Sequence, residues 1–244
     1  MGRRNPRPSN TPPPWSPAAL SAFAWYDVSD LSTLFQDMGQ TVPVTTDGDP
    51  VGMVLDKSGN GYHMTQSVTS ARPIYRTDGL SHWLAFDGIT QSLEHVSLPA
   101  PPTVSVVMAA TVETFPSNFS ALISMASAAD FQIDAGSKTS GFNMRFNGTA
   151  LSSLRPQSST GFEGILHAYC IALNASDGLL LGRVDGVEEY SGSSYNGTLS
   201  AVQHLRLFAD RSGNQPVGGK FYKLALLPTT GLADLDQTEI WALQ

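Results

Sequence analysis

A succession of short apolar segments, separated by turn residues, is the feature that most constrains the fold. No amphipathic helical segment lies between these segments from residue 82 to residue 227, which argues against a βαβ arrangement. Apolar and polar residues alternate with period two in 142–146 and 205–208, as in strands with one buried face. We therefore expect an all-β antiparallel sandwich. The predicted strands are 82–86, 92–98, 103–112, 121–125, 131–133, 142–146, 150–154, 165–173, 179–184, 202–208 and 220–227.

Two further segments frame these strands. Residues 29–35 suit a helical turn capped by Ser29 or Asp30, because both side chains can accept a hydrogen bond from a free helical N–H. Residues 37–61 are rich in Gly, Pro, Asn and Asp and are expected to form loops. Residues 232–243 place leucine and isoleucine among Asp, Gln and Glu and predict one short C-terminal helix.

Residues 1–17 differ in composition from the rest of the chain. They hold six of the 16 prolines, several arginines and no acidic residue. Proline blocks helix and sheet ladders, so this segment is expected to be an extended N-terminal arm, reaching roughly 50 Å at about 3.1 Å per residue. It is either a disordered tail or a docking arm, in which Trp15 is a hydrophobic anchor and Arg3, Arg4 and Arg7 meet an acidic partner.

The remaining residues, 18–244, are expected to form a single β-sandwich domain, since sandwiches of this length commonly stay undivided. The whole chain has a net charge of −7, and 18–244 alone holds 11 Lys and Arg against 21 Asp and Glu. An acidic body repels phosphate, so we expect no nucleic-acid partner. No segment approaches 18 uninterrupted apolar residues, so no membrane span is predicted. The single cysteine, Cys170, lies in an apolar run and is expected to be a buried, inert thiol.

Several motifs resemble those of laminin-G-like, concanavalin A-like jelly-roll domains. The resemblance lies in the order of four segments, 56–63 (Asp-Lys-Ser-Gly-Asn-Gly-Tyr-His), 84–88 (Leu-Ala-Phe-Asp-Gly), 182–186 (Gly-Arg-Val-Asp-Gly) and 219–226 (Gly-Lys-Phe-Tyr-Lys-Leu-Ala-Leu). With the strands between them, these segments cover nearly all of residues 20–244. The resemblance implies a jelly-roll sandwich closed by a strand and a short helix.

A narrower similarity covers Trp25-Tyr26-Asp27, residues 29–37 and the turns up to Arg72-Pro73. It resembles a variant of this domain found in structural proteins of tailed bacteriophages. The resemblance implies a virion protein assembled in the host cytoplasm: a capsid decoration or head-fibre protein, with a homotrimeric, lectin-like sandwich. Its arm would bind the major capsid protein or an adaptor. The alternative is a tail-associated receptor-binding module for host surface glycans.

A search for catalytic motifs favours a protein that is not an enzyme. Glucanases with this fold carry Glu-x-Asp-x-x-Glu on one strand, because retaining hydrolysis needs two neighbouring carboxyl groups. The nearest match is 183–188, where Arg183 stands in place of the nucleophile. No Gly-x-Ser-x-Gly or His-Glu-x-x-His motif occurs, and the five histidines lack metal-ligand spacing. We therefore expect no catalytic, cofactor-binding or metal-ligating residues.

Two binding hypotheses stay open. A calcium site at the edge of the sandwich could use Asp56, Asp87 or Asp185, although solvated turn aspartates are commoner. A glycan could contact Tyr190 and Tyr195, which flank a Ser/Gly-rich loop, because aromatic rings suit the faces of sugars. The alternative for both tyrosines is packing at the end of the sandwich or at a subunit interface.

Overall fold

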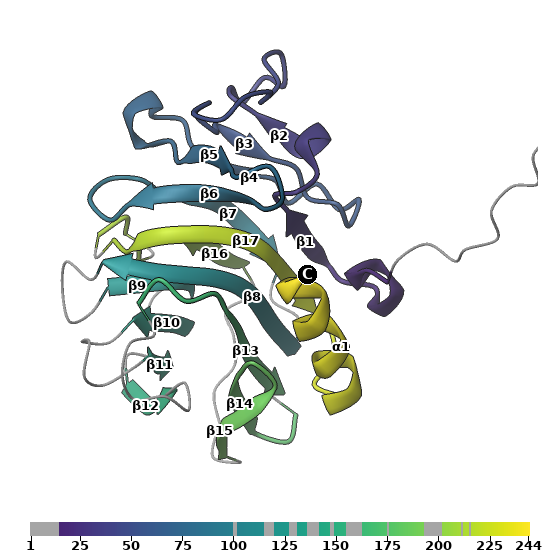
Figure 1. Cartoon of the computed structure of the whole chain (residues 1–244). Helices are drawn as coiled ribbons and strands as arrows, with labels where there is room; N and C mark the ends of the chain where they lie inside the picture. Colours follow the sequence, from purple (N-terminus) through teal and green to yellow (C-terminus); the bar gives the residue numbers. More distant parts are fainter. Residues whose placement is uncertain are drawn as a thin grey trace, which may run out of the picture.

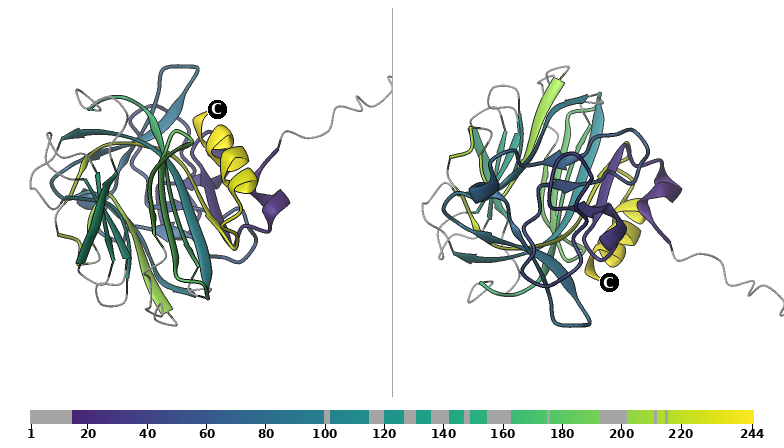
Figure 2. Two further views of the ribbon diagram at one scale, coloured as in Figure 1. Left: turned by 90° about the horizontal axis from the view of Figure 1, so that it is seen from below. Right: turned by 90° about the horizontal axis from the view of Figure 1, so that it is seen from above.

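The strands form two antiparallel sheets that pack face to face, with one helix on the outer side (Figures 1 and 2). This computed structural model describes residues 15–99, 102–114, 120–126, 131–135, 142–146, 149–154, 163–174, 176–192, 202–210, 212–214 and 216–244. The predicted all-β sandwich with a C-terminal helix is confirmed. The predicted arm lies outside the described residues, except for Trp15, Ser16 and Pro17. Within the described part of the chain, no helix is long and apolar enough to cross a membrane.

The first sheet, called sheet A, has the strand order β15-β14-β13-β8-β17-β6-β5, and β1 pairs with β17 at one end. Its long central strands are β8, β17 and β13, and β8 lies between the other two and pairs antiparallel with both. The bounds are β1 Ala24–Asp27, β5 Ile74–Thr77, β6 His82–Asp87, β8 Thr103–Thr114, β13 His167–Asn174, β14 Leu179–Val184, β15 Val187–Gly192 and β17 Gly218–Leu227.

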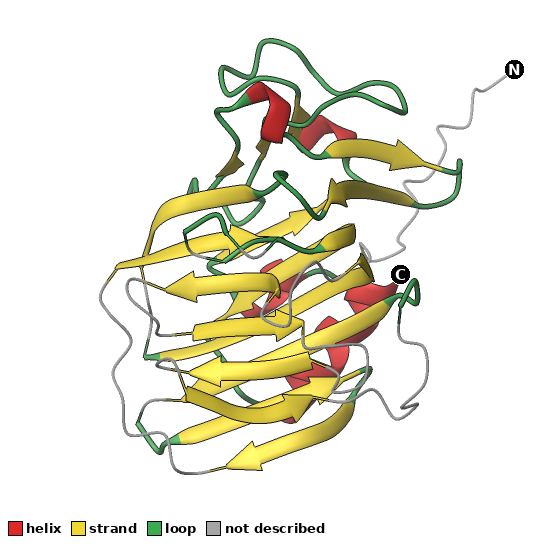
Figure 3. Cartoon of the chain, turned by 90° about the vertical axis from the view of Figure 1, so that its left-hand side faces the viewer, coloured by secondary structure: helices red, strands yellow, loops and turns green. Residues whose placement is uncertain are grey.

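The second sheet, called sheet B, has the order β12-β11-β10-β9-β16-β7-β4-β3-β2, and Figure 3 shows how the strands of the two sheets are stacked. The bounds are β2 Leu34–Phe35, β3 Met53–Val54, β4 Met64–Thr65, β7 Leu93–Pro99, β9 Ser120–Ala126, β10 Phe131–Ala135, β11 Phe142–Phe146, β12 Thr149–Leu154 and β16 Val202–Leu207. The helical elements are 3-10 turns η1 Pro17–Leu20, η2 Leu31–Thr33 and η3 Thr69–Ala71, and the helix α1 Leu232–Leu243.

The main core lies between the sheets and follows from the alternation of side chains along each strand. Val106, Met108 and Ala110 of β8 point into it, as do Leu205 and Leu207 of β16. It also holds aromatic side chains from both sheets, and the rings of Phe86 and Phe208 stack 4.1 Å apart between their centroids.

A second apolar cluster lies on the outer face of sheet A, under α1. The alternate residues of the two central strands, such as Val107 of β8 and Cys170 of β13, are fully buried there. Leu235 and Trp241 of α1 cover them, and Trp241 meets Trp25 edge to face with 5.9 Å between ring centroids. Both faces of the central strands are therefore buried, and this explains why residues 106–110 of β8 are apolar without interruption. Cys170 is the buried, free thiol that the sequence predicts.

The differences between prediction and structure are local. The helical turn predicted at 29–35 is the short η2, with Asp30 as its N-cap, followed directly by strand β2. Strands β1 to β5 were not predicted, and the short β3 lies within the segment 37–61 that was expected to form loops. Strand β15 was not predicted either, because Val-Glu-Glu-Tyr-Ser-Gly shows little apolar character. It forms because Asp185 and Gly186 both adopt positive φ angles (51° and 80°) in a tight turn after β14. This turn brings residues 187–192 beside β14, and β15 forms by backbone hydrogen bonding to β14 although its side chains show no strand pattern.

The turn at 56–62 ties the first strand to the body. Asp56 is buried and accepts hydrogen bonds from the backbone N–H groups of Trp25 (3.1 Å), Ser58 (2.9 Å) and Tyr62 (3.1 Å). The Ser58 hydroxyl also bonds to Asp56 (2.6 Å) and to the carbonyl of Phe23 (3.0 Å). This motif is therefore a structural clasp between β1 and the loop, since its carboxylate oxygens are occupied by protein donors.

Replacing Asp56 by alanine should lower the free energy of unfolding by about 3 kcal/mol, because several buried N–H donors lose their acceptor at once. Urea unfolding followed by fluorescence measures the change. Asp37→Ala is the matched control, since Asp37 also accepts bonds from Thr41 and Val42 but in an exposed turn. Equal shifts of the urea midpoint in both variants would show that burial of the clasp is unimportant.

Candidate functional site

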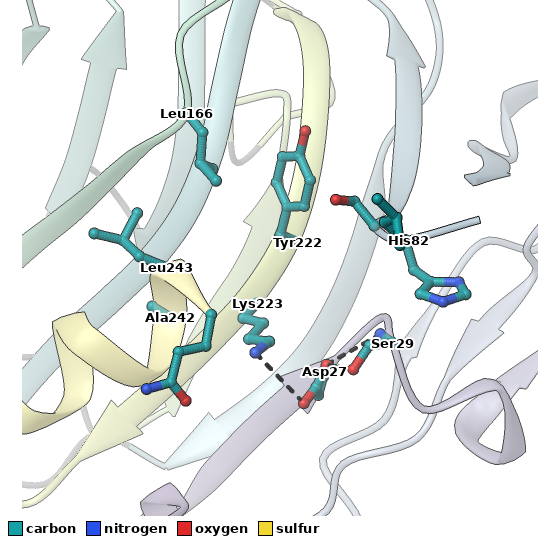
Figure 4. A pocket seen from close by; sticks show the side chains of 11 residues that line it. Asp27, Ser29, His82, Leu166, Tyr222, Lys223, Ala242 and Leu243 are labelled. Atoms are coloured by element: carbon teal, nitrogen blue, oxygen red, sulfur yellow. Dashed lines mark hydrogen bonds and ion pairs between the residues drawn. The ribbon is translucent and has the colours of Figure 1, made fainter. Parts of the chain in front are cut away.

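A pocket lies where α1 ends beside β17, β6 and the end of β1 (Figure 4). It contains about 480 Å³ of empty space, including part that is open to solvent. Aromatic, apolar and charged side chains meet in it, a combination that is typical of small-molecule sites. The lining residues are Asp27, Ser29, Leu80, Ser81, His82, Leu166, Tyr222, Lys223, Ala242, Leu243 and Gln244.

An irregularity in β17 creates one wall of the pocket. The pairing of β17 with β8 shifts register between Phe221 and Lys223. Phe221 and Leu224 remain in the core between the sheets, so two consecutive residues, Tyr222 and Lys223, lie on the outer side. A regular strand would turn one of them inward. Figure 4 shows both side chains at the pocket.

Lys223 links the three elements that meet here. Its Nζ donates to the carbonyl oxygen of Trp241 at the end of α1 (3.1 Å) and lies 3.9 Å from Asp27 Oδ2. It also lies 5.2 Å from the centre of the Trp241 ring. Burial lowers the pKa of Lys223, against the opposing effect of Asp27. The side chain therefore holds a mostly desolvated amine at the base of the pocket.

Asp27 supplies the acceptor beside this amine. Its Oδ1 accepts hydrogen bonds from the backbone N–H of Ser29 (3.0 Å) and from the Ser29 hydroxyl (2.6 Å). Its Oδ2 faces Lys223 at a distance longer than a hydrogen bond. The turn at Ser29 thus fixes the orientation of the carboxylate through Oδ1, while Oδ2 faces Lys223 without bonding to it.

Aromatic rings continue from the pocket across the outer face of sheet A. The rings of Tyr222 and Trp83 lie 6.3 Å apart at an angle of 38°. Lys220 Nζ lies 5.1 Å from the centre of the Trp83 ring. Both rings are half-buried, and burial raises the pKa of Tyr222, with Glu113 and Asp78 adding to the rise. A neutral phenol and an indole therefore flank the charged pair at the pocket.

The helix that closes the pocket is held by a buried charge cluster. Arg183 of β14 pairs with Glu239 of α1 at 3.1 Å and with Asp236, and both Arg183 and Glu239 are nearly inaccessible, at 5% and 3% side-chain exposure. Burial raises the pKa of Glu239 to about 7, although Arg183 opposes the rise. Burial also raises the pKa of the nearby Cys170 thiol, and Glu239 adds to it. The position of α1 is thus linked to the ionisation of one carboxyl group.

The structure does not bring the predicted site residues together. Arg3, Arg4, Arg7 and Tyr195 lie outside the described residues. Trp15 is half-buried and packs against the chain's own cluster under α1, so its observed contact is within the protein. Tyr190 belongs to β15, opposite Gly182, and its side chain lies outside the described part.

The aspartates considered for calcium each have another role. Asp56 forms the clasp to β1, and Asp87 accepts the N–H groups of Ile89 (2.8 Å), Thr90 (2.9 Å) and Gln91 (3.0 Å) in its own turn. Asp185 bonds to His167 (2.6 Å) and to the N–H of Ala168 (2.8 Å). Among the described residues, no three His, Cys, Asp or Glu side chains are grouped as metal ligands.

The pocket residues were missed at the sequence level, because the signal is tertiary. Asp27, Tyr222 and Lys223 come from the first and the last strands of the sandwich, and Leu243 comes from the helix. Tyr222 and Lys223 are adjacent in a sequence that reads as an ordinary strand. The one available signal was two consecutive amphipathic residues within an apolar run, which is compatible with a bulge.

No family model and no curated protein matches the sequence. Solved structures do resemble it. Domain 4 of AbnA, a GH43 extracellular arabinanase from Geobacillus stearothermophilus in complex with arabinotriose, is similar with a TM-score of 0.60 at 12% identity, over 89% of this chain and 98% of that one. A GH54 α-L-arabinofuranosidase soaked with a cyclic sulfate inhibitor is similar with a TM-score of 0.56 at 13% identity, over 79% and 51%. Trypanosoma rangeli sialidase in complex with sialic acid gives 0.54 at 12% identity, over 88% and 32%.

These similarities overturn the predicted function. We expected a virion structural protein that is not an enzyme, and the similar structures are instead parts of enzymes named for their action on glycans. The chain spans about a third of the sialidase and half of the arabinofuranosidase. The motif argument failed because a missing Glu-x-Asp-x-x-Glu excludes one catalytic arrangement on this fold, and a fold hosts many sites. At these identities the similarity establishes the fold alone.

The raised pKa of Glu239 makes stability depend on pH. A carboxyl group whose pKa is higher in the folded than in the unfolded state stabilises the fold when protonated, and this contribution is lost as pH rises from about 4.5 to 7. The free energy of unfolding of the wild type, relative to Glu239→Gln, should therefore fall by on the order of 3 kcal/mol over that range. Urea unfolding at successive pH values measures this difference.

Asp236→Asn is the control, because Asp236 is 57% exposed and pairs with the same arginine. It should keep a fall of stability with pH, but a smaller one than the wild type, because the Asp236 charge contributes to the raised pKa of Glu239. Parallel profiles for the wild type and Glu239→Gln would contradict the assignment of the titrating group.

Proposed function

We propose that this chain is a glycan-recognising β-sandwich domain that binds an oligosaccharide at the pocket formed by Asp27, Tyr222 and Lys223. The observation that carries the proposal is the fixed pairing of a carboxylate acceptor with an amine donor beside an aromatic ring. A sugar-binding site uses such a donor, acceptor and aromatic ring, because sugars have hydroxyl groups at their edges and C–H groups on their faces.

Each group has a distinct role in this proposal. The Tyr222 ring packs against the face of one sugar ring, and Trp83 extends the aromatic surface toward a second ring. Asp27 Oδ2 accepts a hydrogen bond from a sugar hydroxyl, while Lys223 Nζ donates one to a hydroxyl or ring oxygen. Because the Asp27 and Lys223 atoms are 3.9 Å apart and not hydrogen-bonded to each other, one sugar hydroxyl can bridge them from the side, accepting from Lys223 and donating to Asp27.

The similar solved domain from the arabinanase supports this choice of ligand class. That domain is described in complex with arabinotriose, and it matches this chain over nearly its whole length. Arabinotriose is therefore the first ligand to test, followed by xylo-, manno- and gluco-oligosaccharides. The predicted homotrimer is untested and stays a prediction.

Tyr222→Ala should weaken binding of arabinotriose, or of the best oligosaccharide in this panel, about tenfold, equivalent to about 1.4 kcal/mol of lost ring contact. Asp27→Asn should weaken it in the same direction, because the acceptor beside Lys223 loses its charge. Isothermal titration calorimetry measures both affinities.

Tyr190→Ala and Tyr195→Ala are the matched controls, since they remove the tyrosines that the sequence alone offers as glycan contacts. Both variants should bind like the wild type. A large loss in these two and none in Tyr222→Ala would move the site to the Ser/Gly-rich loop.

A further inference from the structure

A continuous row of residues crosses the outer face of sheet B, away from the pocket. The strand pairing connects its members one by one, from β2 through β3, β4, β7 and β16 to β9. At about 4.8 Å between neighbouring strands, these six positions extend over roughly 24 Å. The row consists of Phe35, Met53, Thr65, Glu94, Arg206 and Ser124.

The core fixes the direction in which this row points. Leu93 lies in the core before Glu94, and Leu205 and Leu207 lie in the core on either side of Arg206. Ile123 and Met125 do the same around Ser124. Because successive side chains of a strand point to opposite faces, Glu94, Arg206 and Ser124 face outward together.

The charges at the centre of the row offset each other. The Glu94 carboxylate pairs with the Arg206 guanidinium and accepts a bond from His204 Nε2 at 2.8 Å. Glu94 keeps 29% and Arg206 keeps 14% of its side-chain surface exposed. The centre therefore offers donors and an acceptor, and the charges of Glu94 and Arg206 offset each other. This arrangement suits a neutral ligand rich in hydroxyl groups better than an anion or a cation.

Two polar atoms in the row lack partners. Ser124 Oγ and Arg206 Nε are buried, and neither has a hydrogen-bond partner among the described residues. Ser124 is directly opposite Arg206 in the pairing of β9 with β16, and its side chain is completely buried. Both atoms have no accessible surface, so they lie beneath the row, and the groups that can meet a ligand are the partly exposed side chains of Glu94 and Arg206.

The end of the row on β2 and β3 is apolar. Phe35 is half-buried and faces Met53 in the pairing of these strands. Met53 is buried, so Phe35 is the side chain that can contact the face of a sugar ring, whereas Thr65, Glu94 and Arg206 can bond to hydroxyl edges. Along the row, the side chains on β2 thus suit the face of a sugar ring, and those on β7 and β16 suit its hydroxyl groups.

We propose that this row is a second saccharide site, which binds an extended neutral oligosaccharide lying across the strands of sheet B. Glu94 and Arg206 recognise a pair of adjacent hydroxyl groups, and Phe35 packs against a terminal ring. The site is distinct from the Tyr222 pocket, since the two lie on opposite outer faces of the sandwich. It depends on the proposed function only for the class of ligand.

The test is calorimetric titration of the full chain with arabinohexaose and with the xylo-, manno- and gluco-hexaoses. Wild type should bind two equivalents of the recognised hexaose, and Tyr222→Ala should keep one site at the original affinity. Adding Glu94→Gln to Tyr222→Ala should weaken this remaining site at least tenfold. Urea unfolding of each variant checks that the fold is intact, and Arg206→Lys gives a second variant if Glu94→Gln fails to fold.

Asp47→Asn is the matched control, because it also breaks a surface ion pair, that of Asp47 with Arg76 at 3.0 Å. It should leave both sites unchanged. Loss of all binding in Tyr222→Ala would overturn the second site and leave the pocket standing. One site that responds to Glu94→Gln and not to Tyr222→Ala would support the row and overturn the pocket. No binding of any hexaose would overturn both.

Discussion

The burial of the central strands of sheet A on both faces is the constraint from which the rest of the structure follows. Alternate residues of β8 and β13 fill the core between the sheets, while the others, including Val107 and Cys170, need a second cover. The helix α1 supplies this cover with Leu235 and Trp241. At the end of α1, Tyr222 and Lys223 of β17 face outward. The pocket lies there, at the edge of the area of sheet A that α1 covers.

Charge placement follows the same logic. Arg183 and Glu239 are buried as a pair under α1, where a lone charge would be costly. Lys223 is desolvated at the edge of α1 and is held by a helix carbonyl and by Asp27. On sheet B the charged residues Glu94 and Arg206 pair on the outer face instead, with 29% and 14% of their side-chain surface exposed. The two outer faces therefore present different chemistry, an aromatic pocket on one side and a polar row on the other.

Several local motifs of this chain have structural roles that their sequence patterns do not reveal. The Asp56 motif resembled a family turn and raised a calcium hypothesis, yet its carboxylate is saturated by backbone donors. Arg183 was read as a missing nucleophile, and it is a buried partner of the C-terminal helix. The phage-like segments were interpreted as a virion role, whereas the similar folds belong to parts of glycan-processing enzymes. Asp56 and Arg183 therefore have structural roles, and the predicted virion role is wrong.

The sequence by itself determined the fold class, most of the strands and the terminal helix, because period-two alternation and turn residues are local signals. It also determined the buried state of Cys170, since an apolar run on both sides leaves no exposed face. Only the tertiary structure decided which residues form sites. Asp27 lies beside Lys223, and Glu94 lies beside Arg206, although more than a hundred residues separate the members of each pair. Antiparallel strand pairing brings them together, and no local sequence pattern indicates this pairing. Register between distant strands, and one bulge in β17, place these side chains together.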